Sequence, residues 1–114
     1  MTTDTHIEDL LPHRDRLRLI GEIVELDDQA AVTRSTVSPD WPTAGPDGAD
    51  PVVLIELTAQ TAAICIGARR RRQGKKRGAL GWIVGIKSAR LLVDLIAVGT
   101  TISIESRNQF EYEN

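Results

Sequence analysis

The chain has 114 residues, of which 41% are hydrophobic and 26% are charged, as is usual for one soluble globular domain spanning residues 1–114. Its formal net charge of -2 argues against a protein that coats nucleic acid, since such domains are usually basic. A single cysteine excludes a disulfide within the chain, and no apolar run reaches the roughly 20 residues of a membrane span. Because the start is acidic and unlike a signal peptide, the sequence predicts a cytoplasmic protein.

The first part of the chain predicts a helical turn, a β-hairpin and a loop. The segment IEDLLPHR fits a short helical turn that ends at Pro12, because the residue before a proline avoids the helical region. Apolar and polar residues then alternate in part over LRLIGEIVELDD and again over QAAVTRSTV, with Asp27 and Asp28 favouring a turn between them. Residues 38–50 contain three prolines and two glycines, which predict a loop.

A long helix is expected from about Pro51 to Arg72. Asp50 offers a side-chain acceptor at its start, and Pro51 suits the first helical position because proline has no N–H to leave unpaired. Gly74 is a typical terminator. Because residues 52–66 are apolar nearly all round, we expect the helix to be buried on most of its sides.

Further strands are expected after the helix. The stretches LGWIVGIKSARLL and TTISIESRNQFEYE carry β-branched and alternating residues, and VDLIAVGT joins them with a turn at Gly99. A sheet that wraps one central helix satisfies this order of elements, so the predicted class is α+β. A subunit interface would bury more apolar area, because a domain of this size hides only about two-thirds of its unfolded surface.

A carboxylate, Glu56, interrupts the apolar part of the predicted helix. Burial of an ionised carboxylate without a partner is costly, so this side chain requires an explanation. Gln60 lies four residues further on, on the same helix face, and its amide can hold a carboxyl group in one orientation. The spacing leaves open a structural polar pair, a helix face that reaches solvent, and a general acid beside a reacting group.

Three blocks of the sequence occur in an order that resembles a known enzyme family. They are LPHRDRLRLIGEIVELDD, the helix block PVVLIELTAQ with its E-x-x-A-Q motif, and VGIKSARLLVDLIAVGTTISIE, which contains G-I-x-x-A-R. Together they resemble the hotdog-fold dehydratases that act on 3-hydroxyacyl thioesters of acyl carrier protein, and most closely the branch associated with aryl-polyene pathways. The resemblance implies an antiparallel sheet around one central helix, and it leaves open whether the last strand of the family is present.

The resemblance also implies roles for individual residues. Glu56 corresponds to the family's acid, which protonates the departing hydroxyl, and Gln60 would be its supporting amide. Backbone N–H groups near Val52 and Val53 would polarise the thioester carbonyl. The family's histidine base lies in a loop just before the helix, but the corresponding stretch PTAGPDGADP contains no histidine. His13, in the LPHR block, is the remaining candidate for the base, but a structural role is favoured for it. No role is assigned to His6.

Basic residues cluster between Arg69 and Arg77. This run is either a solvated helix end or a docking patch, including Arg72, Lys75 and Lys76, for an acyl carrier protein or for the phosphates of its pantetheine arm or of coenzyme A. Cys65 is expected to be a small buried hydrophobe, and Trp41 and Trp82 to line the core or a pocket. The sequence shows no metal-ligand spacing and suggests no cofactor.

Three hypotheses follow from these features. The first is a homodimeric dehydratase of 3-hydroxyacyl thioesters, in which Glu56, Gln60 and His13 form the site. The second is a catalytically silent hotdog subunit that binds acyl thioesters or a partner hotdog chain, which the missing loop histidine favours. The third is hydrolysis of an acyl thioester on the same fold, because a carboxylate can activate water.

Overall fold

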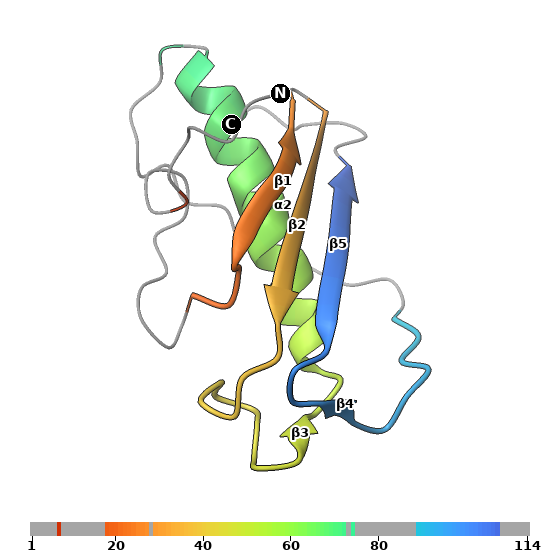
Figure 1. Ribbon diagram of the computed structural model, residues 1–114. Helices are drawn as coiled ribbons and strands as arrows, with labels where there is room; N and C mark the ends of the chain where they lie inside the picture. Colours follow the sequence, from red (N-terminus) through yellow and green to blue (C-terminus); the bar gives the residue numbers. More distant parts are fainter. Residues whose placement is uncertain (1–6, 8–17, 28, 73, 75–88, 108–114) are drawn as a thin grey trace.

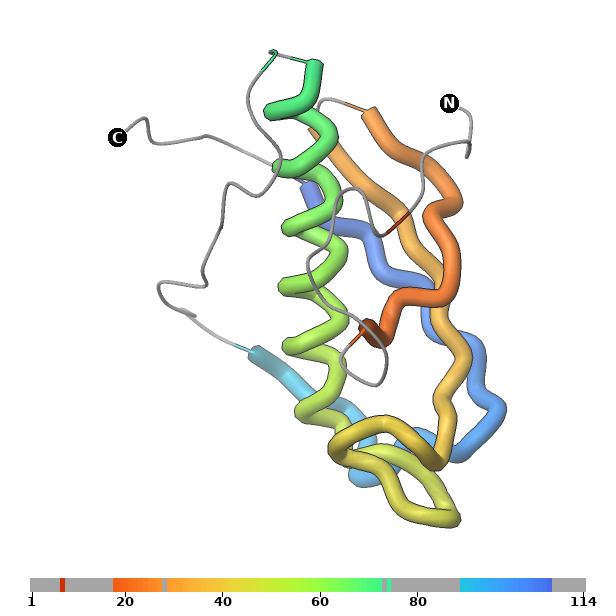
Figure 2. Tube along the Cα trace, turned by 90° about the vertical axis from the view of Figure 1, so that its left-hand side faces the viewer, coloured from red at the N-terminus to blue at the C-terminus, as the bar shows by residue number. Residues whose placement is uncertain are grey.

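The computed structural model describes residues 7, 18–27, 29–72, 74 and 89–107. Three strands form one antiparallel sheet in the order β1-β2-β5, and β3 pairs with β4 in a second, two-stranded sheet. Helix α2 lies along one face of the larger sheet, and β3 and β4 lie near its first turn (Figures 1 and 2). The elements are β1 Glu22–Leu26, β2 Ala30–Thr36, β3 Gly48–Ala49, α2 Val53–Arg72, β4 Ile96–Ala97 and β5 Thr101–Arg107.

The predicted hairpin is confirmed by β1 and β2, and its turn is held by Asp27. The Asp27 backbone N–H donates to the carbonyl of Ala30, while its Oδ1 accepts from the N–H groups of Gln29 at 2.8 Å and Ala30 at 2.9 Å. These bonds to the ionised form hold the pKa of the Asp27 carboxyl below its ordinary value. The aspartate therefore stabilises the turn in its charged form.

A β-bulge explains why the alternation in the first strand is only partial. The pairing of β1 with β2 shifts between Ile23 and Glu25, so Val24 is the additional residue. Without it, Ile23 and Leu26 would point to opposite faces of the sheet, because they are three positions apart. With the bulge, both side chains are buried beneath the helix.

The central strand β2 presents small side chains to the helix. Ala31, Thr33 and Ser35 are buried, whereas Arg34 and Thr36, on the other face, are exposed. The hydroxyl of Thr33 lies 2.8 Å from that of Thr61 on α2, and Thr61 Oγ1 also donates to the carbonyl of Leu57. Small residues allow the helix to approach the strand closely, and the paired hydroxyls satisfy each other inside the contact.

The predicted bounds of the helix are confirmed within two residues, since α2 spans Val53–Arg72. Asp50 Oδ1 accepts from the Val52 N–H at 2.9 Å, as expected of a capping residue. At the other end, Gly74 has a φ of 75° and its N–H donates to the carbonyl of Arg71. A left-handed conformation of this kind is open to glycine and ends the helix.

The expectation that the helix is buried on most sides is wrong for the single chain. One stripe is fully buried against the sheet, and it comprises Val53, Leu57, Gln60, Thr61, Ile64, Cys65 and Ala68. On the opposite side of the helix, apolar side chains such as Ile55 and Ile66 are only half-buried. The physical reason is that one sheet covers one side of a helix, so the second apolar side has no cover within the described chain.

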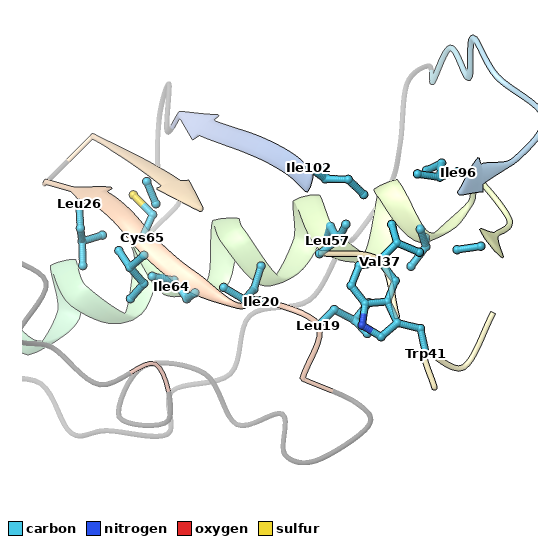
Figure 3. Packing of buried hydrophobic residues seen from close by; sticks show 14 of the residues in the cluster. Leu19, Ile20, Leu26, Val37, Trp41, Leu57, Ile64, Cys65, Ile96 and Ile102 are labelled. Carbon is cyan, nitrogen blue, oxygen red and sulfur yellow. The ribbon is translucent and has the colours of Figure 1, made fainter. Parts of the chain in front are cut away.

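The core runs along the whole contact between helix and sheet. Figure 3 shows Trp41 beside Leu19 and Val37, whereas Ile64 and Cys65 lie further along the helix. Trp41 is 7% exposed, which confirms the expected core position for this tryptophan. Trp82 lies outside the described residues.

The second half of the chain follows the prediction only in part. Strand β5 and the turn at Gly99, which has a φ of 90°, are confirmed. In the predicted strand LGWIVGIKSARLL, residues 80–88 are outside the described part and residues 89–92 are not a strand. The two-residue strand β4 forms instead within the expected connection, and its partner β3 lies in the predicted loop of residues 38–50.

Two other expectations concern segments that are mostly outside the described residues. In the first, IEDLLPHR, only Ile7 is described, and it is helical. Residues 108–114, where a last strand would follow β5, are likewise not described. Within the described part of the chain, no helix has the length and apolar character required to cross a bilayer.

The contact between β3 and β4 leaves no space for a side chain at Gly48. A Cβ atom at this position would lie 2.3 Å from the backbone oxygen of Ile96, whereas at Gly45, in the same loop, it would meet no atom within 4 Å. We expect Gly48→Ala to destabilise the protein by about 1–3 kcal/mol, since backbone must move to relieve the overlap. Thermal or denaturant unfolding measures the effect. Gly45→Ala is the control, with an expected change within about 0.5 kcal/mol; equal stability of the two variants would contradict the prediction.

Candidate functional site

A pocket of about 560 Å³ lies at the start of α2. Three segments form its wall: the residue that leads into β1, the loop before the helix, and the first helical turn. Apolar surface dominates this wall, with one carboxylate and one hydroxyl residue among the side chains. The lining residues are Leu19, Pro42, Thr43, Val52, Val53, Ile55 and Glu56.

The carboxyl group of Glu56 is held by Gln60 at this wall. Gln60 Nε2 donates to Glu56 Oε2 at 2.9 Å, and Gln60 Oε1 accepts from the backbone N–H of Leu19 at 3.0 Å. The Gln60 side chain is completely buried. The expected pairing of Glu56 with Gln60 along the helix is thus present, and Leu19 is its third member.

The Leu19 N–H fixes which end of the Gln60 amide faces Glu56. A backbone N–H can only donate, so the amide oxygen must face Leu19 and the NH₂ group must face the carboxyl. A buried amide that is bonded at both ends has little freedom to rotate, because each broken bond would leave a buried polar atom unpaired. The helix and the segment before β1 therefore orient Glu56 jointly.

The position of Glu56 corrects the expectation of a buried carboxylate. In the single chain the Glu56 side chain is exposed, on the uncovered side of the helix, whereas the Gln60 side chain is fully buried. The cause is the same one-sided cover that leaves the second apolar side of α2 half-exposed. Glu56 nevertheless faces a mainly apolar pocket and has a fixed orientation, which is an arrangement suited to proton transfer.

Val52 and Val53 line the pocket, but their N–H groups are not free donors. The Val52 N–H donates to Asp50 Oδ1 at 2.9 Å, and the Val53 N–H donates to the carbonyl of Asp50 at 3.0 Å. In this structure both groups are therefore engaged by Asp50, and their contact with a thioester oxygen stays a prediction. The same aspartate that caps the helix uses both donors.

Of the other predicted site residues, only Arg72 lies in the described part of the chain. His13, Lys75 and Lys76 lie outside the described residues, as does His6. Arg72 is exposed in the last helical turn, sixteen residues after Glu56. At about 1.5 Å per residue this is about 24 Å along the axis, so Arg72 and the pocket are at opposite ends of the helix.

Sequence reasoning missed three contributions to the site. All three residues precede the helix: Leu19 reaches the pocket from the segment before β1, and Pro42 and Thr43 reach it from the loop of residues 38–50. Pro42 and Thr43 lie in the stretch where the resembling family carries its histidine, which was the available signal. Leu19 contributes a backbone group, for which a sequence carries no residue-specific signal.

Cys65 lies in the seam between helix and sheet, away from the pocket lining. Its side chain is 1% exposed, and burial raises the pKa of the thiol, with the nearby Asp27 charge acting in the same direction. The expectation of a small buried side chain at Cys65 is confirmed. No group of three or more His, Cys, Asp or Glu residues in the described segments is arranged to hold a metal ion.

The sequence matches the ApeP-like family, described as ApeP dehydratase, over residues 5–114. The chain belongs to the ApeP-like dehydratase family. This family is the aryl-polyene dehydratase branch that the sequence motifs resemble. The reaction that this membership supports is dehydration of a 3-hydroxyacyl thioester in polyene biosynthesis.

A solved structure shares the fold of this ApeP-like chain. It is "The Dehydratase Heterocomplex ApeI:P from Xenorhabdus doucetiae", matched with a TM-score of 0.84 and 23% identity over 94% of this chain and 73% of that chain. The predicted α+β hotdog fold is confirmed, with one helix against an antiparallel sheet. A search of curated proteins found no match.

The amide of Gln60 in this ApeP-like protein should support the fold as well as the site. In Gln60→Met, which keeps the volume, the buried Leu19 N–H loses its acceptor, so we expect a loss of about 1–3 kcal/mol in the free energy of unfolding. Denaturant titration measures it. Gln29→Met is the control, because Gln29 is an exposed turn residue that contributes only its backbone N–H to the turn. Similar losses in the free energy of unfolding of both variants would show that the hydrogen bond from Gln60 to Leu19 does not stabilise the fold.

Proposed function

We propose that this chain dehydrates a 3-hydroxyacyl thioester with Glu56 as the acid. The observation that carries the proposal is a carboxyl group that is oriented by a buried amide at the wall of a mainly apolar pocket. The dehydratase family agrees with this chemistry. An apolar wall suits an acyl chain, and a carboxylic acid supplies the proton that a departing hydroxyl requires.

The reaction requires an acid and a base. A base removes a proton from the carbon next to the thioester carbonyl, and the electron pair of that C–H bond forms the new double bond. The C–O bond at the third carbon breaks, and the proton of Glu56 goes to the leaving oxygen, so that water departs. Gln60 is the positioning residue that keeps the carboxyl directed to this oxygen. His13 is the candidate base within the sequence.

The acyl group is proposed to arrive on acyl carrier protein or on coenzyme A. Both carry a phosphorylated pantetheine arm, to which Arg72, Lys75 and Lys76 would offer positive charge. Arg72 is about 24 Å from Glu56 along its own helix. This separation favours contact of the basic run with the carrier itself or with a second subunit's substrate, in a protein that works in the cytoplasm.

Glu56→Gln should lower the rate of enoyl thioester formation by on the order of 10²–10⁴-fold, because the amide cannot give up a proton. The assay offers a 3-hydroxyacyl carrier-protein thioester and follows the enoyl product. Glu25→Gln is the matched control, since Glu25 is exposed on β1 and does not line the pocket. Unchanged turnover in Glu56→Gln would refute the proposal, and release of free acid would indicate a thioesterase instead.

A second candidate function is that of a subunit within a dehydratase assembly. Exposed large hydrophobic side chains support it, and most of them lie in one segment: Leu91, Leu92, Val93, Leu95 and Val98. The second apolar side of α2 is half-buried as well. The similar solved structure is a heterocomplex, so a hotdog partner, identical or not, is a suitable cover for these surfaces.

Association should depend on the exposed segment. We expect Leu92→Glu, at a side chain that is 81% exposed, to shift the protein toward a monomer, because a charge cannot be buried without a partner. Sedimentation or light scattering of the chain, alone and with a hotdog dehydratase partner, measures the shift. Thr101→Glu, on the exposed face of β5, is the control. A wild-type chain that stays monomeric in both settings would contradict this candidate function.

A further inference from the structure

The capped helix start leaves the thioester carbonyl without its expected donors. Both Val52 and Val53 give their N–H groups to Asp50, and the prolines Pro42 and Pro51 have no N–H. In the proposed reaction, negative charge develops on the carbonyl oxygen when the neighbouring carbon loses its proton. A hydrogen-bond donor directed at this oxygen is usually the largest single contribution to such catalysis.

Thr43 is the residue of the described pocket wall whose side chain can donate and is not the acid. Its hydroxyl ionises far too weakly to act as a general base near neutral pH, so its suitable role is that of a hydrogen-bond donor. Thr43 is an exposed residue on the loop of residues 38–50, and it is therefore on a different element from Glu56.

The loop around Thr43 is held in place on both sides. The Thr43 carbonyl accepts from the N–H of Asp50, and the next residue, Ala44, donates to the carbonyl of Trp41 and bridges to Ala49. Trp41 is anchored in the core. These bonds hold the backbone that carries the hydroxyl, which lowers the cost of ordering the donor when substrate binds.

We infer that the Thr43 hydroxyl is the carbonyl-binding group of the site and donates to the thioester oxygen while Glu56 serves the leaving hydroxyl. The inference rests on the proposed function for its role in turnover. It divides the work of the site between two elements, with the loop binding the carbonyl and the helix protonating the leaving group.

The kinetic test compares Thr43→Val, which keeps the shape and removes the hydroxyl, with Thr43→Ser, which keeps the hydroxyl. We expect Thr43→Val to lower kcat on the order of 10²-fold with little change in KM, because the bond strengthens as charge develops on the oxygen. Thr43→Ser should remain close to wild type. Thr36→Val, on the exposed face of β2, is the control for the substitution itself.

A binding test decides the inference independently of turnover. A saturated acyl pantetheine with an isotope-labelled carbonyl cannot be dehydrated, and infrared spectroscopy reports the hydrogen bond to its oxygen as a lower stretching frequency. We expect the lowered frequency in the wild type and in Thr43→Ser, and its loss in Thr43→Val. If the wild type shows the shift but no dehydration, the proposed function fails and the carbonyl assignment stands. Equal frequencies in all variants, or no binding of the probe to the wild type, would overturn the assignment.

Discussion

The buried amide of Gln60 is the interaction on which the candidate site depends. It joins the segment before β1 to the helix, through Leu19, and it sets the direction of the Glu56 carboxyl. Because the backbone N–H of Leu19 can only donate, the Gln60 amide has one favourable orientation. In this orientation its NH₂ group, and not its oxygen, faces the Glu56 carboxyl. An exposed carboxylate at a helix start would ordinarily rotate among several conformers. Here a polar group inside the core limits that freedom, so the fold and the site share one interaction.

The two apolar sides of α2 differ in burial, because the sheet covers only one of them. The side with Leu57 and Ile64 is buried against the sheet, whereas the side with Ile55 and Ile66 is half-buried in the single chain. Glu56 lies on this second side, next to the pocket. A partner that covered the second side would also reduce the access of water to Glu56. Assembly and acid catalysis are therefore physically linked in the proposed function, since low access of water strengthens every polar interaction within a site.

Local signals predicted the hairpin, the helix bounds, the turn at Gly99 and the Glu56–Gln60 pair, because each of these features depends on neighbours within a few residues. Features that depend on distant parts of the chain were not predictable in the same way. The bulge at Val24 is required by the side of the sheet on which the core lies, and the pairing of β3 with β4 joins segments almost fifty residues apart. The cap at Asp50 was predicted, yet its use of the Val52 and Val53 N–H groups becomes evident only from the geometry. Leu19 and Thr43 reach the site through the tertiary fold alone.

The close contact between α2 and β2 has a consequence for the size of the acyl group. Ala31, Thr33 and Thr61 fill the seam between helix and sheet without leaving solvent-accessible surface, and the hydroxyl pair closes it further. In the proposed function, a hydrocarbon tail that enters beside Glu56 would have to part these buried contacts in order to slide beneath the helix, since side chains inside a protein are closely packed. We therefore expect its far end to run outward along the uncovered side of α2. Selection by tail length would then be exercised at the boundary with a neighbouring molecule, and two assemblies built on the same chain could differ in the tails that they accept.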